Sequence, residues 1–429
     1  MGFDCELGVV YPSSDMIFIK FLVMPVICIF LGLVGTVVSV DAGDWYRWRG
    51  PNVNGISEEA DWNAKWSDDG PKRLWKAKVG TGFSSVTIAD GRAYSMGNSG
   101  RGRGVEKDTI FCFNALTGKT LWSHSYESKL DPKYYDGGTS ATPTIDGNFV
   151  YTLSKDGLLF CFEASSGKVV WEKNVGKAIK AKRPMWGYAS SPLVIDNALL
   201  VNVGTYGTCL DKKTGEIIWE TGRAASGYSS FVPYTRGDQD ELVLFAAEEV
   251  VGINPEDGKK LWGYPWKTKY GVNSADPILL DDMVFISSGY DRGCALLKVN
   301  GAKVTKIWEN KNMCNHFNAC VLIDGHLYGF SGNTGRGVLR CLEMATGKIK
   351  WEEKSFGGFG ALQAIGKKLL IISNQGELVV ADSNPGSFTE ISRAQVTGPK
   401  CWTTPVLSNG RVYCRNSRGD LVCLDLSSK

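Results

Sequence analysis

The residues best suited to bind a ligand lie in short segments that lead into predicted β-strands. Such a set suits a planar or polyhydroxylated ligand, because rings stack on flat or apolar faces while amides and an imidazole exchange hydrogen bonds. The two tryptophans, Trp186 and Trp402, could instead simply plug the channel around which these segments are arranged, in which case they bind nothing. The set consists of Trp186, Tyr188, Tyr228, Asn273, Asn315, His316 and Trp402.

Arginines in glycine-rich loops form a second candidate set at the rim, made up of Arg101, Arg103, Arg292 and Arg336. A guanidinium on such a loop could bind a carboxylate or a phosphate. Solvated loop tips without a ligand are the alternative interpretation. These loops are not dinucleotide-binding fingerprints, because none has Gly-x-Gly-x-x-Gly at the start of a helix.

The sequence identifies no catalytic residue and no metal site. It has three histidines, of which His316 alone belongs to the candidate set. A Ser-His-Asp site would need this histidine and one of many serines, with no motif to select it. The ligand spacing of a zinc site and the pattern of an EF-hand loop are both missing from the sequence.

A repeated phrase must position these segments. It is Cys-x9-Trp with a glycine turn inside it, and its clear or weaker versions end at Trp122, Trp171, Trp219, Trp262, Trp308 and Trp351. Together with Trp75, these tryptophans follow one another at intervals of 43 to 49 residues. A period of about 40–50 residues with short strands and glycine turns indicates a solenoid or a propeller. Residues that recur are therefore assigned to architecture, and residues that break the repeat are candidates for function.

Each repeat is predicted to form four short antiparallel strands. In the clearest unit, residues 141–171, turns such as Asp146-Gly147 separate runs of β-branched and aromatic residues. Eight units can be traced, so the sequence predicts an all-β, eight-bladed propeller. The seventh has Phe388 to Ile391 where its tryptophan would be, and the eighth lacks an outer strand. We expect the N-terminal strand around Trp75 to complete the eighth blade and close the ring, which removes open sheet edges.

The repeated tryptophans and cysteines are expected to be structural. A flat indole fills the gap between neighbouring blades while its N–H bonds a backbone carbonyl. Cysteines at one repeat position lie in equivalent strands of different blades, too far apart for a disulfide. A Cys314–Cys320 bridge remains one alternative for the cysteines outside the pattern, which are Cys294, Cys314, Cys320, Cys401 and Cys414.

Residues 1–42 are predicted to be a signal peptide. Lys20 precedes the apolar run from Phe21 to Val38, and small or tolerated residues precede Gly43. Met16 fits a true start, with residues 1–15 as an upstream extension, because the acidic residues there do not suit a basic leader. An uncleaved membrane anchor is the alternative, because the apolar run is about long enough to cross a bilayer. Residues 43–429 are then expected to form one exported propeller domain, periplasmic or extracellular.

The repeat resembles the tryptophan-docking repeat of PQQ-like, or quinoprotein-type, β-propellers. The shared phrase is Ala/Cys-x-Asp/Glu-x-x-Thr-Gly-Lys-x-x-Trp, and the likeness covers nearly all of residues 74–429. The family includes PQQ-dependent alcohol dehydrogenases, polyvinyl-alcohol-dehydrogenase-like proteins and the propeller of the outer-membrane barrel-assembly machinery. The opening Trp48-Arg-Gly-Pro51 also resembles secreted bacterial PQQ-like propellers. One fold hosts many functions, so the resemblance implies fold more firmly than activity.

Two functions are compatible with this reading. The first is an exported binding or scaffold protein that acts through its central funnel or rim on a protein, a glycan or a small polar ligand. The alternative, implied by the resemblance, is a PQQ-dependent dehydrogenase for an alcohol or a polymer, with PQQ and Ca²⁺ as cofactors. A tryptophan would then cover the quinone, an amide would bind Ca²⁺, and Asp136 or Asp276 would act as the base.

The sequence favours the binding role. It has neither the vicinal cysteine pair that covers the quinone in many alcohol dehydrogenases nor a haem attachment motif. A formal net charge of +3 over 429 residues is too small to indicate a nucleic-acid partner. The only membrane contact that the sequence suggests is through the N-terminal segment.

Overall fold

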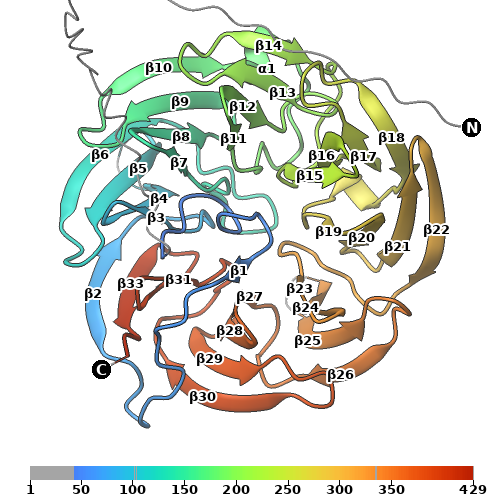
Figure 1. The fold of residues 1–429 in the computed structure, drawn as a ribbon. Helices are drawn as coiled ribbons and strands as arrows, with labels where there is room; N and C mark the ends of the chain where they lie inside the picture. The colour runs from blue at the N-terminus through green and yellow to red at the C-terminus, as the bar shows by residue number, and fades with distance from the viewer. Residues whose placement is uncertain (1–42, 101, 103, 334–335, 429) are drawn as a thin grey trace, which may run out of the picture. The chain divides into compact units, whose positions relative to one another are not determined.

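The computed structural model describes residues 43–100, 102, 104–333 and 336–428. Over this part of the chain, eight β-sheets are arranged around one axis, so the predicted all-β, eight-bladed propeller is confirmed (Figure 1). Helical structure in the same residues is limited to α1 (Val175–Ala178) and the 3-10 turn η1 (Lys269–Gly271). No helix in the described ranges is long and apolar enough to cross a membrane. The predicted signal peptide, residues 1–42, lies outside them, as do Arg101 and Arg103.

The first four blades follow one another in chain order. Blade 1 comprises β3 (Thr87–Ala89), β4 (Arg92–Asn98), β5 (Lys107–Asn114) and β6 (Thr120–Glu127). Blade 2 comprises β7 (Thr144–Asp146), β8 (Phe149–Leu153), β9 (Leu158–Glu163) and β10 (Val169–Asn174). Blade 3 comprises β11 (Leu193–Ile195), β12 (Ala198–Val201), β13 (Thr208–Asp211) and β14 (Ile217–Glu220). Blade 4 comprises β15 (Val232–Arg236), β16 (Gln239–Phe245), β17 (Glu249–Ile253) and β18 (Lys260–Pro265).

The last four blades include two strands from the N-terminal region. Blade 5 comprises β19 (Ile278–Leu280), β20 (Met283–Ser288), β21 (Gly293–Asn300) and β22 (Lys303–Asn310). Blade 6 comprises β23 (Val321–Ile323), β24 (His326–Asn333), β25 (Arg336–Glu343) and β26 (Ile349–Glu353). Blade 7 comprises β27 (Ala361–Ile365), β28 (Lys368–Ile372), β29 (Glu377–Asp382) and β30 (Thr389–Gln395), with β1 (Ile56–Ser57) parallel to β27. Blade 8 comprises β31 (Val406–Ser408), β32 (Arg411–Arg415), β33 (Asp420–Asp425) and β2 (Arg73–Lys78).

The ring closes as predicted, through the N-terminal strand. β2 pairs antiparallel with β33, and Trp75 lies opposite Cys423 as each repeated tryptophan lies opposite its repeat partner. A buried guanidinium reinforces the same junction, because Arg415 at the end of β32 donates to the carbonyls of Gly82 (2.9 Å) and Met96 (2.7 Å) in blade 1. The first and last blades are thus joined by backbone pairing and by side-chain hydrogen bonds.

The outer-strand tryptophans dock on the next blade, which confirms their predicted role. The Trp122 ring lies against Gly167 in the turn of blade 2, so closely that a Cβ atom at that glycine would lie 2.5 Å from the ring. Its N–H donates to the Ala164 carbonyl of the same turn (2.9 Å). The equivalent N–H bonds to a following turn are made by Trp75, Trp171, Trp219, Trp308 and Trp351. The turn with the Thr-Gly-Lys motif is therefore the docking site for the tryptophan of the preceding blade.

Two blades depart from this docking scheme. Trp262 donates to the Glu241 carboxylate of its own blade (2.6 Å), because the next blade has a tight Asn300-Gly301 hairpin in place of the usual turn. In blade 7 the register position of the tryptophan is held by Ser392, opposite Val380, and not by residues 388–391 as expected. Trp66 of the N-terminal region packs against the adjoining core instead, and its backbone N–H donates to Ser392 Oγ (3.4 Å).

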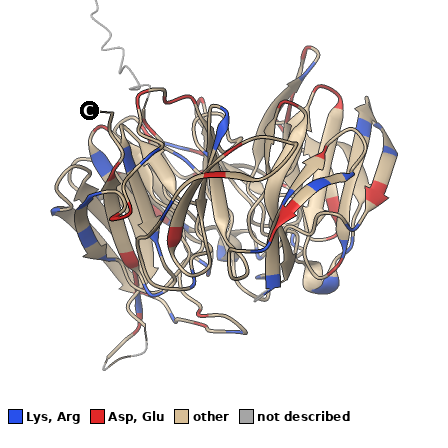
Figure 2. Ribbon diagram, turned by 90° about the horizontal axis from the view of Figure 1, so that it is seen from below, with Lys and Arg blue, Asp and Glu red and all other residues tan. Residues whose placement is uncertain are grey.

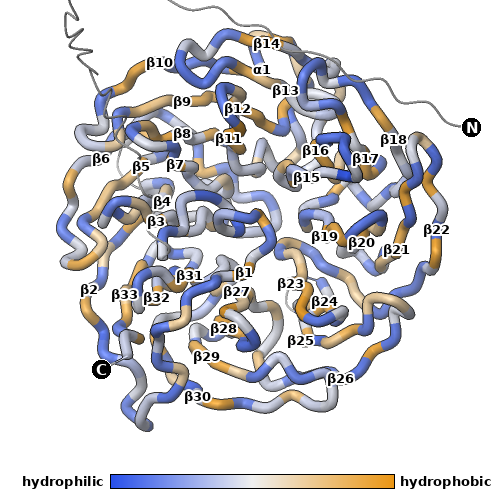
Figure 3. Tube along the Cα trace, in the orientation of Figure 1, coloured by the Kyte–Doolittle hydropathy of each residue, from blue (hydrophilic) through white to orange (hydrophobic). Residues whose placement is uncertain are grey.

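The hydrophobic core lies between blades. Apolar residues follow the strands while the turns are hydrophilic (Figure 3), and the core clusters each join strands of neighbouring blades. All ten described cysteines are buried and free, so the repeat cysteines are small core residues as predicted and no Cys314–Cys320 bridge is formed. Basic and acidic residues are interspersed along the ribbon (Figure 2).

Candidate functional site

A cavity of about 210 Å³ lies among the segments that enter the inner strands. Of the residues predicted to bind a ligand, four line it: Trp186, Tyr228, His316 and Trp402. The loop before blade 2 contributes Lys133, Tyr134 and Tyr135. We refer to this cavity as the funnel.

Aromatic rings form a continuous arc around the funnel, which we call the aromatic collar. Successive ring centroids are 4.1 to 6.2 Å apart along Tyr135, Phe83, Trp402, Phe317, His316, Tyr290, Tyr270, Trp186 and Tyr228. Trp402 is stacked with both Phe83 (5.4 Å) and Phe317 (4.9 Å). The collar draws on rings from seven different blades or their entering loops, so no single repeat could have revealed it.

Every tryptophan that lines the funnel has its N–H committed to the protein. Trp186 Nε1 donates to the Lys133 carbonyl (2.9 Å), and Trp402 Nε1 donates to Asn374 Oδ1 (3.0 Å). Trp48 Nε1 donates to Asp276 Oδ2 (2.7 Å). These indoles therefore offer a ligand carbon surface and no hydrogen-bond donor.

Hydrogen bonds link the inner strands of blades 1 to 5 around the channel. At one equivalent position, each backbone N–H donates to the side chain of the next blade: Ser85 to Thr142 (3.0 Å), Thr142 to Ser191 (2.9 Å), Ser191 to Ser230 (2.9 Å) and Ser230 to Asp276 (2.7 Å). Since Ser191 and Ser230 act only as acceptors toward the described residues, their hydroxyl protons remain available in the funnel.

The N-terminal segment closes the floor of the funnel, and we call residues 44–57 the plug. Figure 1 shows this blue segment crossing the centre of the ring before β1. The backbone N–H of Trp45 donates to the Ile88 carbonyl of blade 1 (2.9 Å). Arg49 donates to the Cys320 carbonyl of blade 6 (2.9 Å), and β1 pairs with β27 of blade 7. At this position blades 6 and 7 have Ala319 and Ala361, which have no polar side chain, and the plug reaches both blades through Arg49 and β1. The sequence had marked the Trp-Arg-Gly-Pro phrase only as a family resemblance.

Asp276 anchors the plug. In blade 5 it takes the place that a serine or threonine occupies in blades 2 to 4, and it is 5% exposed. Its carboxylate accepts hydrogen bonds from the Trp48 indole N–H and from the Ser230 backbone N–H. Burial raises the pKa of Asp276 above its ordinary value, while Arg49 at 3.9 Å and the two hydrogen bonds oppose that rise. Both carboxylate oxygens are thus engaged, which does not support the expectation that Asp276 serves as a base for an alcohol.

Three predicted ligand-binding residues do not reach the funnel. Tyr188 is 2% exposed and packs in the core between blades 2 and 3. The Asn273 amide donates to the Ala246 carbonyl (2.8 Å), and Asn273 Oδ1 accepts from Ser288 (2.8 Å). The Asn315 amide donates to the Phe330 carbonyl (3.0 Å). The Asn273 side chain satisfies buried groups of blades 4 and 5, and the Asn315 amide satisfies one of blade 6, where an unpaired group would be costly.

Two of the predicted rim arginines, Arg292 and Arg336, are among the described residues. Arg292 lies 3.4 Å from the ring centre of Trp266 and forms an ion pair with Glu309 (2.7 Å). Arg336 is exposed at the start of β25. Neither lines the funnel. Arg101 and Arg103 fall outside the described residues, so the prediction for them stays a prediction.

His316 is a neutral hydrogen-bonding group in the collar. It is 4% exposed, and burial lowers its pKa below the ordinary value. Its Nδ1 lies 2.8 Å from Asn333 Oδ1, an oxygen that also accepts from the Tyr290 N–H (2.9 Å). Because that oxygen accepts, Nδ1 carries the proton and Nε2 is left as an acceptor.

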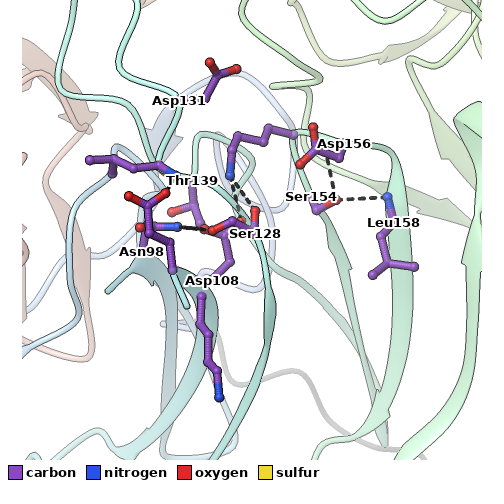
Figure 4. Close-up of polar contacts among 12 residues, drawn as sticks. Asn98, Asp108, Ser128, Asp131, Thr139, Ser154, Asp156 and Leu158 are labelled. Carbon is purple, nitrogen blue, oxygen red and sulfur yellow. Dashed lines mark hydrogen bonds and ion pairs between the residues drawn. The ribbon is translucent and has the colours of Figure 1, made fainter. Parts of the chain in front are cut away.

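A buried polar cluster joins blades 1 and 2, and Figure 4 shows Asn98, Asp108 and Ser128 of this cluster close together. Lys155, 3% exposed, donates to Asp108 Oδ2 (3.2 Å) and Ser128 Oγ (2.5 Å). Asn98 donates to Asp108 Oδ1 (2.7 Å) and to the Ser128 carbonyl (3.0 Å). The Lys155 side chain thereby fixes the start of the loop that carries Lys133 to Tyr135.

The backbone of Lys155 fixes a second collar loop. Its carbonyl accepts from the Tyr188 N–H (3.0 Å) and from Arg183 Nε (3.2 Å). Arg183 also pairs with Asp131 (3.0 Å) and Asp156 (2.9 Å), which ties the Trp186 loop to the Tyr135 loop. One buried lysine thus holds both loops.

Three tyrosines at the funnel have left-handed backbone conformations. Their φ angles are 65° at Tyr134, 66° at Tyr270 and 53° at Tyr290. Bulky residues adopt such angles only under constraint, and backbone strain of this kind concentrates at functional sites. Tyr134 is 95% exposed and Tyr270 is 54% exposed. Positive φ angles also occur in turns elsewhere in the chain, but all three tyrosines that adopt them lie at the funnel.

The donors near the funnel do not fit a Ca²⁺–PQQ pair. Asp276, Asn273 and Asn315 are engaged as described, and Asp136 pairs with Lys400 (2.9 Å). Among the described residues, no group of three or more histidine, cysteine or carboxylate side chains is arranged to hold a metal ion. An anionic quinone bound here would lack the ligand set that the dehydrogenase hypothesis requires.

Comparisons with known proteins agree with the repeat. A family model described as outer membrane protein assembly factor BamB matches residues 106–353. The protein of that name from Escherichia coli (strain K12) is 26% identical over 251 residues, 53% of this chain and 63% of that protein. Its Salmonella typhimurium counterpart is 27% identical over 239 residues, 50% of this chain and 59% of that protein. The matched region thus spans less than two thirds of the length of these curated relatives.

Solved structures share the architecture. BamB from Moraxella catarrhalis has a TM-score of 0.58 at 15% identity, covering 83% of this chain and 97% of that chain. A europium-containing methanol dehydrogenase has a TM-score of 0.63 at 12% identity, covering 87% and 90%. Identities this low establish the fold alone. With its docking repeat and eight-bladed ring, and with the family model matching more than half of its length, the chain belongs to the PQQ-like β-propeller family that the BamB model describes.

Proposed function

We propose that this chain is an exported binding protein that holds a ligand containing a small ring in its funnel. The observation that carries the proposal is the aromatic collar above free hydroxyl groups, in a cavity whose floor is closed by the plug. Rings of the collar supply stacking surface, and Ser191 and Ser230 supply hydrogen bonds at depth. Export is supported by the apolar N-terminal segment and by the outer-membrane role named for the curated relatives.

A binding role accounts for the site better than oxidation of an alcohol. The candidate base and the candidate amide ligands are committed to the plug and to blade interiors. The collar and the strained tyrosines need no reacting group to explain them. A scaffold role on a protein partner would use the same exposed rim, where Tyr134 and Tyr270 are accessible.

The test is a ligand-observed NMR screen of small ring compounds against the purified full chain. We expect hits whose signals disappear in Trp186→Ala and persist in the outer-strand variant Trp171→Phe. In parallel, the protein is titrated with PQQ and Ca²⁺ by calorimetry and assayed for dye-linked alcohol oxidation. Turnover of an alcohol would replace the binding role with the dehydrogenase role. A screen without a single Trp186-dependent hit would contradict ligand binding at the funnel.

A further inference from the structure

We infer that the funnel binds an uncharged pyranose-type sugar ring, supplied by the end of a neutral glycan or by a free sugar. The inference rests on the proposed binding function and specifies its ligand class. It follows from four properties of the funnel: its charge, its ring surfaces, its polar groups and its shape.

The funnel offers no unpaired charge to a ligand. Two of the described lining residues carry an ionisable acid or amine at neutral pH, Lys133 and Asp276. Lys133 Nζ lies 3.4 Å from the Asp131 carboxylate and donates to the Met185 carbonyl (3.3 Å). Asp276 is held by Trp48 and faces Arg49. A charged ligand would lose its hydration without gaining a free counter-charge, so a neutral ligand is favoured.

The ring surfaces suit the carbon face of a sugar. Because the N–H groups of Trp48, Trp186 and Trp402 are bonded within the protein, these rings present only apolar surface. The C–H face of a pyranose is apolar, and burying it against such rings releases water without stranding a polar atom. A cation could also approach aromatic faces, but it would leave the hydroxyl groups of the funnel unpaired.

The polar groups of the funnel include both donors and acceptors, as a sugar hydroxyl requires. Ser191 and Ser230 have hydroxyl protons that no described residue accepts. His316 Nε2 and Asn318 Oδ1 are acceptors, since Nδ1 of the former faces Asn333 and the amide of the latter donates to the Trp402 carbonyl (2.9 Å). A hydroxyl group donates one hydrogen bond and accepts others, so it can pair with both kinds.

The shape of the funnel limits what can enter. Its volume of about 210 Å³ is below the roughly 300–1,000 Å³ typical of pockets for drug-sized ligands. One sugar ring suits that space better than a fused-ring cofactor. The plug closes the floor, so a glycan can enter only by its end, and its next rings would lie on the exposed rim beside Tyr134 and Tyr270.

The experiment is a glycan array of neutral and acidic oligosaccharides probed with the purified full chain, followed by calorimetry on the hits. We expect neutral glycans to bind, Trp186→Ala to abolish binding, and Ser191→Ala or Ser230→Ala to weaken it about tenfold. Trp171→Phe, on the outer strand of blade 2, is the matched control and should bind as the wild type does. Titration with the matching monosaccharide separates the two sources: a similar affinity indicates a free sugar, and a much weaker one indicates a chain end.

Other outcomes separate this inference from the proposed function. Binding of acidic glycans only, or neutral binding that survives Trp186→Ala, would overturn the sugar assignment. If the ring compounds of the NMR screen bind at the funnel and no glycan does, the sugar assignment fails and the binding function stands. If neither binds, both fail.

Discussion

The tryptophans of the outer strands and those of the funnel satisfy their N–H groups in the same way but differ in what their ring faces contact. Both groups donate their N–H to the protein, as Trp122 does to Ala164 and Trp186 does to Lys133. The outer rings are then covered by a glycine of the next blade, whereas the funnel rings face a cavity. In one region the indole surface is used for folding, and in the other it is left for a ligand.

The two groups of tryptophans also differ in whether they recur from blade to blade. Five of the outer tryptophans, Trp75, Trp122, Trp171, Trp219 and Trp308, recur with a glycine of the next blade against the ring. The funnel tryptophans have no counterpart in other blades, and each N–H acceptor is different: a backbone carbonyl, the Asn374 amide and the Asp276 carboxylate. Residues that break the repeat therefore cluster where the molecule is no longer symmetric.

Removal of the N-terminal strand should break the outer architecture completely. We expect deletion of residues 43–78 to abolish soluble folding, because blade 8 would lose β2 and expose β33 as an open edge. Deletion of residues 43–60 removes the plug and leaves β2, and should yield a folded but less stable ring. Cooperative thermal unfolding of the longer deletion near the wild-type temperature would refute this account of closure.

Single tryptophan substitutions should separate the two regions. Trp122→Ala is expected to lower the free energy of unfolding by roughly 3–5 kcal/mol, because it empties an interface between blades. Trp186→Ala should cost about 1 kcal/mol or less, because its ring borders a cavity. Urea unfolding followed by circular dichroism measures both. Equal losses would mean that Trp186 is architectural after all.

The Lys155 cluster links the regions, and its removal should affect both. Lys155→Met leaves Asp108 buried without its partner and is expected to cost about 3 kcal/mol. Hydrogen exchange should rise in residues 129–140 and 180–188, which carry the collar loops. The double variant Lys155→Met/Asp108→Asn should recover part of the stability, since no unpaired charge remains. Unchanged exchange in both loops would show that the cluster does not position the collar.

The smallest expected effect concerns Asp276 and the plug. Burial raises its pKa, so the ionised carboxylate lowers folded-state stability as pH rises from the ordinary carboxyl pKa through the native one. Asparagine does not titrate. The stability of the wild type minus that of Asp276→Asn should therefore fall as the pH rises above the ordinary carboxyl pKa. The exposed Asp61→Asn is the control, and a difference that rises over this range would contradict the raised pKa.

Part of the site could be predicted from the sequence. Trp186, Tyr228, His316 and Trp402 were identified because they occupy entering segments, and segments of this kind meet at one end of a propeller. Asn273 and Asn315 met the same criterion but do not line the cavity, because pattern alone does not tell which amide is needed by nearby buried carbonyls. Trp48 and Asp276 lie 228 residues apart in the chain, and nothing in either segment signals their hydrogen bond.

The sequence by itself determined the blades, their number and the closing strand, because these follow from local strand periodicity and a phrase repeated along the chain. It also determined which tryptophans and cysteines are structural. Only the tertiary structure decided which end of the channel is closed, which rings remain uncovered and which polar groups are left without partners. Those properties depend on contacts between residues far apart in the chain, at positions where the repeat does not constrain the side chain.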